Sequence, residues 1–159
     1  INLYQLEHEG RDKLDLGGLT DNEVKELLQS LKRCTRQIPE DMPLIGRIKD
    51  DTPVVDFKNH IEYFLHRYRN PFDSKRFSLH IRFQQTNDHL IRIDIHNGTH
   101  RNPDGTLIPE NHMHVYHFVK GLRKDVIAIP LPAEIHNITS LFAALEDFLA
   151  YTNVTEYPK

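Results

Sequence analysis

The stretch FSLHIRF at residues 77–83 is followed, after a polar turn at Asn87-Asp88, by IRIDIH at residues 91–96. In both stretches apolar and polar residues alternate. Because successive side chains of a β-strand point to opposite faces, this pattern predicts two strands with one buried face each. The two stretches therefore predict a hairpin whose apolar side faces the core.

Further elements are expected on both sides of this hairpin. Thr20 and Glu23 have the spacing of a capping box, and apolar residues follow at helical spacing, which predicts a helix from about residue 20 to 31. A second apolar stripe predicts a helix over residues 139–151. Other strands are expected at residues 44–48, 54–57, 61–68, 112–119 and 126–131, with a helix as the alternative at 61–68.

We therefore expect an α+β fold. The prediction is one domain over residues 1–159, built on an antiparallel sheet of about five strands. One face of the sheet is expected to be covered by an N-terminal and a C-terminal helix.

Composition narrows the classes of function. The net charge of −3 does not indicate a strongly basic nucleic-acid binder, although nucleic acid stays a possible partner. The single cysteine, Cys34, cannot form an internal disulfide, which fits a reducing compartment and a cytoplasmic location. No apolar run approaches the roughly 18 residues that would span a bilayer, so no membrane contact is expected.

Histidines are the chemically informative residues, since the chain has 11 of them. His112 and His114 lie two residues apart, so on a strand they point the same way, about 7 Å apart at their Cα atoms. A third ligand must come from a neighbouring strand or loop. The candidate ligands are His80, Asp94, His96, His100, His112 and His114.

Zinc is the cofactor that this set favours, because zinc accepts three histidines or two histidines with a carboxylate. If His114 is a ligand, its other ring nitrogen needs an acceptor that orients the ring. We expect Asp94 to take that role. The simpler alternative is that these histidines cover a solvated sheet face without binding an ion.

A metal-free catalytic alternative also exists. His96 with His112 or His114, an arginine (Arg82 or Arg92) and Tyr116 could perform acid–base chemistry on a phosphodiester. The protein would then be a histidine-dependent endoribonuclease of the toxin kind. Tyr63, Phe64 and Tyr68 could stack bases, although they also alternate as core residues would.

The stretches at residues 93–105 (IDIHNGTHRNPDG), 112–116 (HMHVY) and 145–149 (LEDFL) resemble small uncharacterised proteins carried by phages and mobile elements of Gram-positive bacteria. The resemblance covers roughly the second half of the chain. It implies a role in phage–host conflict, since small phage proteins with histidine-held zinc include inhibitors of CRISPR nucleases. It further implies a protein partner, a host defence nuclease that the chain would inhibit by binding.

Overall fold

The structure, a computed structural model, describes residues 14–40 and 43–158. Within these ranges the chain forms two helices, α2 (Asp21–Gln29) and α3 (Leu141–Tyr151), and a set of strands. The strands are β1 (Lys32–Cys34), β2 (Ile48–Asp56), β3 (Ile61–Arg69), β4 (Phe77–Phe83), β5 (His89–Ile95), β6 (His100–Arg101), β7 (Leu107–Ile108), β8 (His112–Val115), β9 (Ala128–Pro130) and β10 (Val154–Thr155). The expected α+β class is confirmed.

The main sheet has eight strands in the order β10-β1-β2-β3-β4-β5-β8-β9. The predicted number of about five was too small, and the strands that no pattern predicted, β1 and β10, have only three and two residues. So short a strand cannot display alternation. The sheet is also mixed. β1 and β10 pair in parallel, whereas every other pair of neighbouring strands in the sheet is antiparallel. β6 and β7 form a separate two-stranded hairpin.

Two strand boundaries differ from the predictions. The strand expected at 44–48 does not form, since only its last residue, Ile48, belongs to a strand; β2 runs from there through most of the expected strand at 54–57, pairs with β3 along its whole length, and is not interrupted by Pro53. Leu44 lies outside β2 and is 90% exposed. The strand expected at 112–119 ends at Val115.

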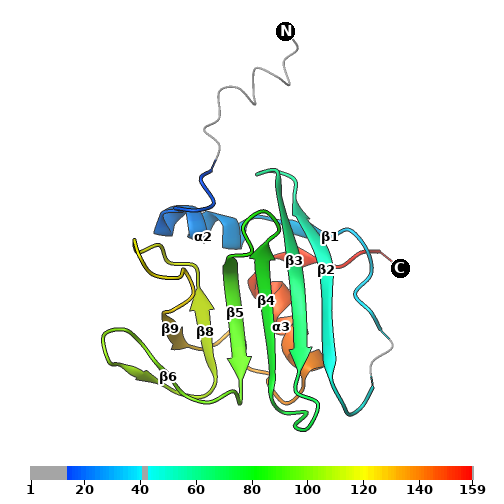
Figure 1. Cartoon of the computed structure of the whole chain (residues 1–159). Coiled ribbons are helices and arrows are strands. Elements are labelled where there is room, and N and C mark those ends of the chain that lie inside the picture. The colour runs from blue at the N-terminus through cyan, green and yellow to red at the C-terminus, as the bar shows by residue number, and fades with distance from the viewer. Residues whose placement is uncertain (1–13, 41–42, 159) are drawn as a thin grey trace.

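The hairpin predicted from residues 77–96 is present as β4 and β5. Leu79, Ile81, Ile91 and Ile93 have no exposed surface, and they join Leu145 and Phe148 of α3 in one core. Figure 1 shows α3 behind the sheet, while no helix of the described chain crosses the front of β2–β5. The sheet therefore has one apolar face covered by α3 and one open, polar face.

The N-terminal helix has the predicted capping box, in which Thr20 Oγ1 accepts from the Glu23 amide and the Glu23 carboxylate accepts from the Thr20 amide. Its buried residues, Val24 and Leu27, belong to the same core. In Figure 1, α2 lies along the upper ends of the strands. The expectation that both helices cover one face is thus not confirmed for α2.

Candidate metal centre

The register of the sheet places the polar residues of the open face in rows that run across the strands. One row consists of successive cross-strand neighbours from β2 to β8: Asp51, His66, His80, Arg92 and His114. In the next row Asp94 of β5 is the direct neighbour of His112 of β8. Asp94 therefore lies beside His112 and diagonally opposite His114.

These three side chains form a group that could hold a metal ion. One ligand atom from each of Asp94, His112 and His114 lies within 4.8 Å of the other two. Asp94 Oδ2 is 3.3 Å from His112 Nε2 and 3.4 Å from His114 Nε2. All three side chains are buried, with at most 8% of any one exposed. The coarse part of the prediction is confirmed, since the structure brings together residues that could hold a metal ion.

The distances suit a small cation with four ligands. Zinc binds nitrogen and oxygen ligands at about 2.0–2.1 Å, so neighbouring ligand atoms of a tetrahedral site lie about 3.3 Å apart. The two contacts of Asp94 Oδ2 have this length. These two distances therefore fit two edges of such a tetrahedron.

The hydrogen bond that His112 Nδ1 donates determines what its other nitrogen, Nε2, offers to the Asp94 carboxylate. His112 Nδ1 donates to the carbonyl oxygen of Pro109 at 2.8 Å. In the neutral ring Nε2 then carries a lone pair, and that lone pair faces the Asp94 carboxylate. Two acceptors at this distance repel each other unless a proton or a cation lies between them.

His114 is the second unusual ring. Neither of its nitrogens has a hydrogen-bond partner, although both are buried, because the 3.4 Å contact with Asp94 is not aligned for a hydrogen bond. A buried polar atom without a partner costs about 1–3 kcal/mol. A metal ion bound to His114 Nε2 would remove part of that cost. Asp94 lies where it could be a ligand, which is one of the two roles that we expected for it, and it does not orient the second nitrogen of His114.

Arg92 is the positively charged neighbour of the group and pairs with two carboxylates. It donates from Nε to Asp94 Oδ2 at 3.1 Å and from Nη1 to Asp125 Oδ2 at 3.0 Å. Burial by itself would raise the pKa of Asp94, but the neighbouring His114, Arg92 and His112 outweigh burial and lower it. Asp94 is therefore an ionised carboxylate at neutral pH, the form that binds a metal.

His100 lies next to the group without belonging to it. Its ring centre is 4.8 Å from that of His114 and 5.8 Å from that of His112. His100 Nε2 donates to the carbonyl oxygen of Val126 at 2.7 Å, which leaves Nδ1 as the nitrogen with a lone pair. The β6–β7 hairpin that carries His100 is fixed to β9 by two hydrogen bonds between Asn102 and the backbone of Ala128.

The structure does not bring the other two candidate ligands into the group. His96 has a positive φ of 52° just after β5, and its Nδ1 contacts Glu110 Oε1 at 3.0 Å. His80 lies farther along the row, where Arg92 separates it from His114. The two-residue alternation that we used for β5 and β8 says which face a residue shares, but it does not say how far along the face it lies.

His80 instead forms a stack with His66 and His89. The ring centres of His66 and His80 are 4.6 Å apart, and those of His80 and His89 are 4.0 Å apart. His80 Nε2 accepts from Arg82, which in turn binds Asp51 through both terminal nitrogens. The stack joins β3, β4 and β5 on the open face.

Two residues of the nuclease alternative have other roles. Tyr116 turns into the core, where its ring meets Phe83, and its hydroxyl donates to the Leu16 carbonyl and accepts from the Leu19 amide. Arg82 is paired with Asp51. Of the three aromatic residues that could have stacked bases, Tyr63 also lies in the core.

The carbonyls of Pro109 and Val126, which orient His112 and His100, were not predicted. Backbone acceptors have no residue type by which the sequence could mark them. Arg92 was proposed for a phosphodiester, and its bridge between Asp94 and Asp125 was also missed. The alternation that places Arg92 and Asp94 on one face could have indicated the first of these two contacts.

Comparison with known proteins gives a family. Residues 19–154 match the profile of a family of unknown function, DUF6978. The chain belongs to DUF6978. The match covers His100 and all three residues of the group that could hold a metal ion. No curated protein and no solved structure matches the chain.

Neither helix in the described part of this DUF6978 chain has the length and apolar character needed to cross a membrane.

Proposed function

We propose that Asp94, His112 and His114 bind one zinc ion and that the ion stabilises a small interaction protein. The observation that carries the proposal is the convergence of three possible ligand atoms at one buried point, above all the two unpaired nitrogens of His114. Zinc is favoured over magnesium or calcium because imidazole is a borderline ligand that hard cations avoid.

We further propose that His100 is the fourth ligand, through Nδ1. Metal-binding histidines usually donate their second nitrogen to a carbonyl or carboxylate, which fixes the ring. His112 has this arrangement through Pro109, and His100 has it through Val126. A site with four protein ligands has no open position, and closed zinc sites of this kind are structural. This supports a stabilising role for the ion.

Cobalt substitution tests the ligand set. Co²⁺ bound to four protein ligands should give the intense visible absorption of a tetrahedral complex. His100→Ala should lower the affinity by on the order of 100-fold, since even the loss of an orienting partner costs 10–100-fold, and should change the spectrum. His96→Ala is the matched control and should leave both unchanged. An unaltered spectrum in His100→Ala would exclude His100 as a ligand.

The biological setting rests on the resemblance to phage and mobile-element proteins. We propose that the zinc-bound protein inhibits a host defence nuclease by binding to it. The test is DNA cleavage by a purified RNA-guided nuclease from a Gram-positive host, with increasing amounts of the protein. Inhibition should occur with the wild type and be lost in His112→Ala/His114→Ala. Undiminished cleavage at a large molar excess across several such nucleases would refute this part of the proposal and leave the metal site untouched.

A further inference from the structure

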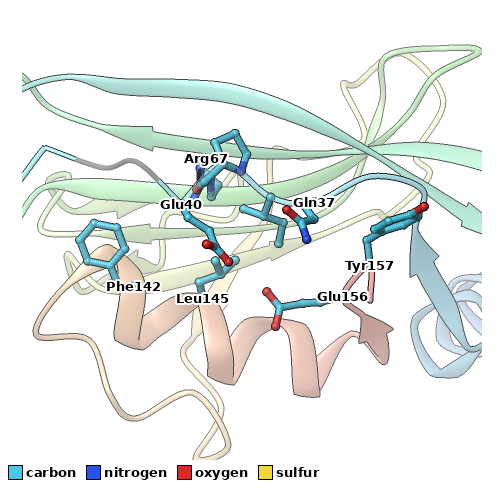
Figure 2. Close-up of a pocket in the computed structure, with 9 residues that line it drawn as sticks. Gln37, Glu40, Arg67, Phe142, Leu145, Glu156 and Tyr157 are labelled. Atoms are coloured by element: carbon cyan, nitrogen blue, oxygen red, sulfur yellow. Dashed lines mark hydrogen bonds between the residues drawn. The ribbon is translucent and has the colours of Figure 1, made fainter. Parts of the chain in front are cut away.

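Two features outside the metal centre differ in how accessible their polar groups are. One is the cavity between α3 and the segment 37–40, which Figure 2 shows. Its guanidinium group, that of Arg67, has no exposed surface and binds both carboxylate oxygens of Asp50. Arg67 thus supports the fold and is out of the reach of a ligand. The other feature is the loop after β5, where the polar groups are exposed.

Asn97 and Gly98 form the only Asn-Gly pair of the sequence. They lie in the loop that joins β5 to β6 (Figure 1), and both are exposed. Within the described part of the chain, neither the Asn97 side chain nor the Gly98 amide has a hydrogen-bond partner. Gly98 has a φ of +83°, and a Cβ added there would meet no atom within 4 Å. No contact of the fold therefore holds the Gly98 nitrogen away from the Asn97 side chain.

We propose that Asn97 is a site of spontaneous deamidation. The Gly98 nitrogen gives its proton to water or hydroxide and attacks Cγ of Asn97. A bond forms between that nitrogen and Cγ, the bond from Cγ to Nδ2 breaks, and the leaving nitrogen takes up a proton from water and departs as ammonia. Water then opens the succinimide at either carbonyl group, which gives aspartate or isoaspartate.

Asp104 and Gly105 form a similar pair whose polar groups are already used. The Gly105 amide donates to the Asn102 carbonyl at 2.8 Å, and Asp104 Oδ1 accepts from the Thr106 amide at 2.9 Å. The bond from Thr106 also lowers the pKa of Asp104, so this carboxylate is ionised at neutral pH and is a poor target for a nucleophile. The same attack at this turn must first break both hydrogen bonds. The fold therefore separates two pairs that the sequence makes alike.

Deamidation changes the connection between two strands that carry polar residues. Either product adds one negative charge next to His96, whose Nδ1 contacts Glu110 Oε1 at 3.0 Å. The isoaspartate product also adds a methylene group to the main chain between β5 and β6. The reaction needs no metal ion, so this inference is independent of the proposed zinc site.

Peptide mass spectrometry tests the proposal on the full chain after incubation at mildly alkaline pH. The peptide that contains Asn97 should gain the mass difference between asparagine and aspartate, and an isoaspartyl methyltransferase should label it. Anion exchange should show a more acidic species at the same rate. Asn97→Gln is the blocked variant and should show none of these changes at this position, because a glutamine side chain must close a larger ring, which forms far more slowly.

Asp104→Asn tests the structural part of the proposal. The variant keeps the Oδ1 acceptor for Thr106 and makes residues 104 and 105 the same dipeptide as residues 97 and 98. In the folded protein this pair should deamidate roughly tenfold more slowly than Asn97, or more slowly still, because two hydrogen bonds must open first. In guanidinium chloride the two pairs should react at similar rates.

Two results would overturn the proposal. One is an Asn97 that keeps its amide in the folded protein over the time in which the unfolded chain loses it. The other is a folded Asp104→Asn protein in which both pairs react equally fast, since the hydrogen bonds at residues 104–106 would then give no protection.

Discussion

At the scale of single residues, the histidines of the open face differ in what their ring nitrogens meet. Those of His114 meet no donor or aligned acceptor, which makes the ring a candidate metal ligand. Those of the stack meet arginine: His80 accepts from Arg82, and the neighbouring ring of His89 lies beside Arg92. The same residue type therefore could bind an ion at one end of the row and stays neutral at the other.

The stack makes stability depend on pH. Burial, followed by the charges of neighbouring groups, lowers the pKa of His80 to about 2 and that of His89 to about 4, from an ordinary value of 6.5. Above pH 6.5 both the folded and the unfolded chain keep these rings neutral. Below it the unfolded chain binds protons that the folded chain excludes, so the free energy of unfolding falls as the pH falls from about 6.5 toward 4.

The test is urea unfolding between these pH values, with a chelator present to remove any bound metal. Each ring contributes a slope of at most about 1.4 kcal/mol per pH unit, so His80→Gln/His89→Gln should flatten the dependence clearly. His136→Gln alters an exposed ring and should not. Equal slopes in the wild type and the double variant would show that the stack does not exclude protons.

At the scale of elements, alternation and capping were predictable and short strands were not. Residues 77–96 have enough length to display a period of two, and Thr20 and Glu23 mark a helix start by residue type. β1 and β10 have neither feature, since two or three residues cannot establish a period. They form because the ends of α2 and α3 lead into the same edge of the sheet.

Lys32 of β1 joins those two helix ends. The lysine is 1% exposed, and its Nζ donates to the carbonyls of Leu28 and Ser30 near the end of α2 and of Thr152 after α3. Carbonyls at helix C-termini carry partial negative charge and lack partners within the helix. Desolvation by burial lowers the pKa of Lys32 to about 8. Keeping this ammonium group charged in the folded protein therefore costs free energy.

Lys32→Met keeps the apolar stem and removes the three donated hydrogen bonds. The variant should lose about 1–3 kcal/mol of unfolding free energy, because the carbonyls stay buried without a donor. Chemical denaturation measures the loss, and Lys25→Met on the exposed side of α2 is the control. A Lys32→Met protein as stable as the wild type would mean that relief of desolvation balances the lost hydrogen bonds.

At the scale of the whole molecule, the sequence predicted which residues share a face but not their positions along it. The two-residue spacing of His112 and His114, and the alternation in β5, place Asp94 on their side of the sheet. Only the register between β5 and β8 shows that Asp94, and not His80 or His96, meets them. The connection between these strands is long and contains its own hairpin, so its length does not determine that register.

The zinc content of the purified protein tests the central claim most directly. After dialysis against metal-free buffer, elemental analysis should find one zinc per chain in the wild type and in a His96→Ala/His136→Ala control, which changes two histidines outside the group. His112→Ala/His114→Ala should contain none and should melt at a lower temperature, since an ion that binds only the folded state stabilises it. A wild type that holds no zinc, and whose melting temperature added zinc does not raise, would contradict the account.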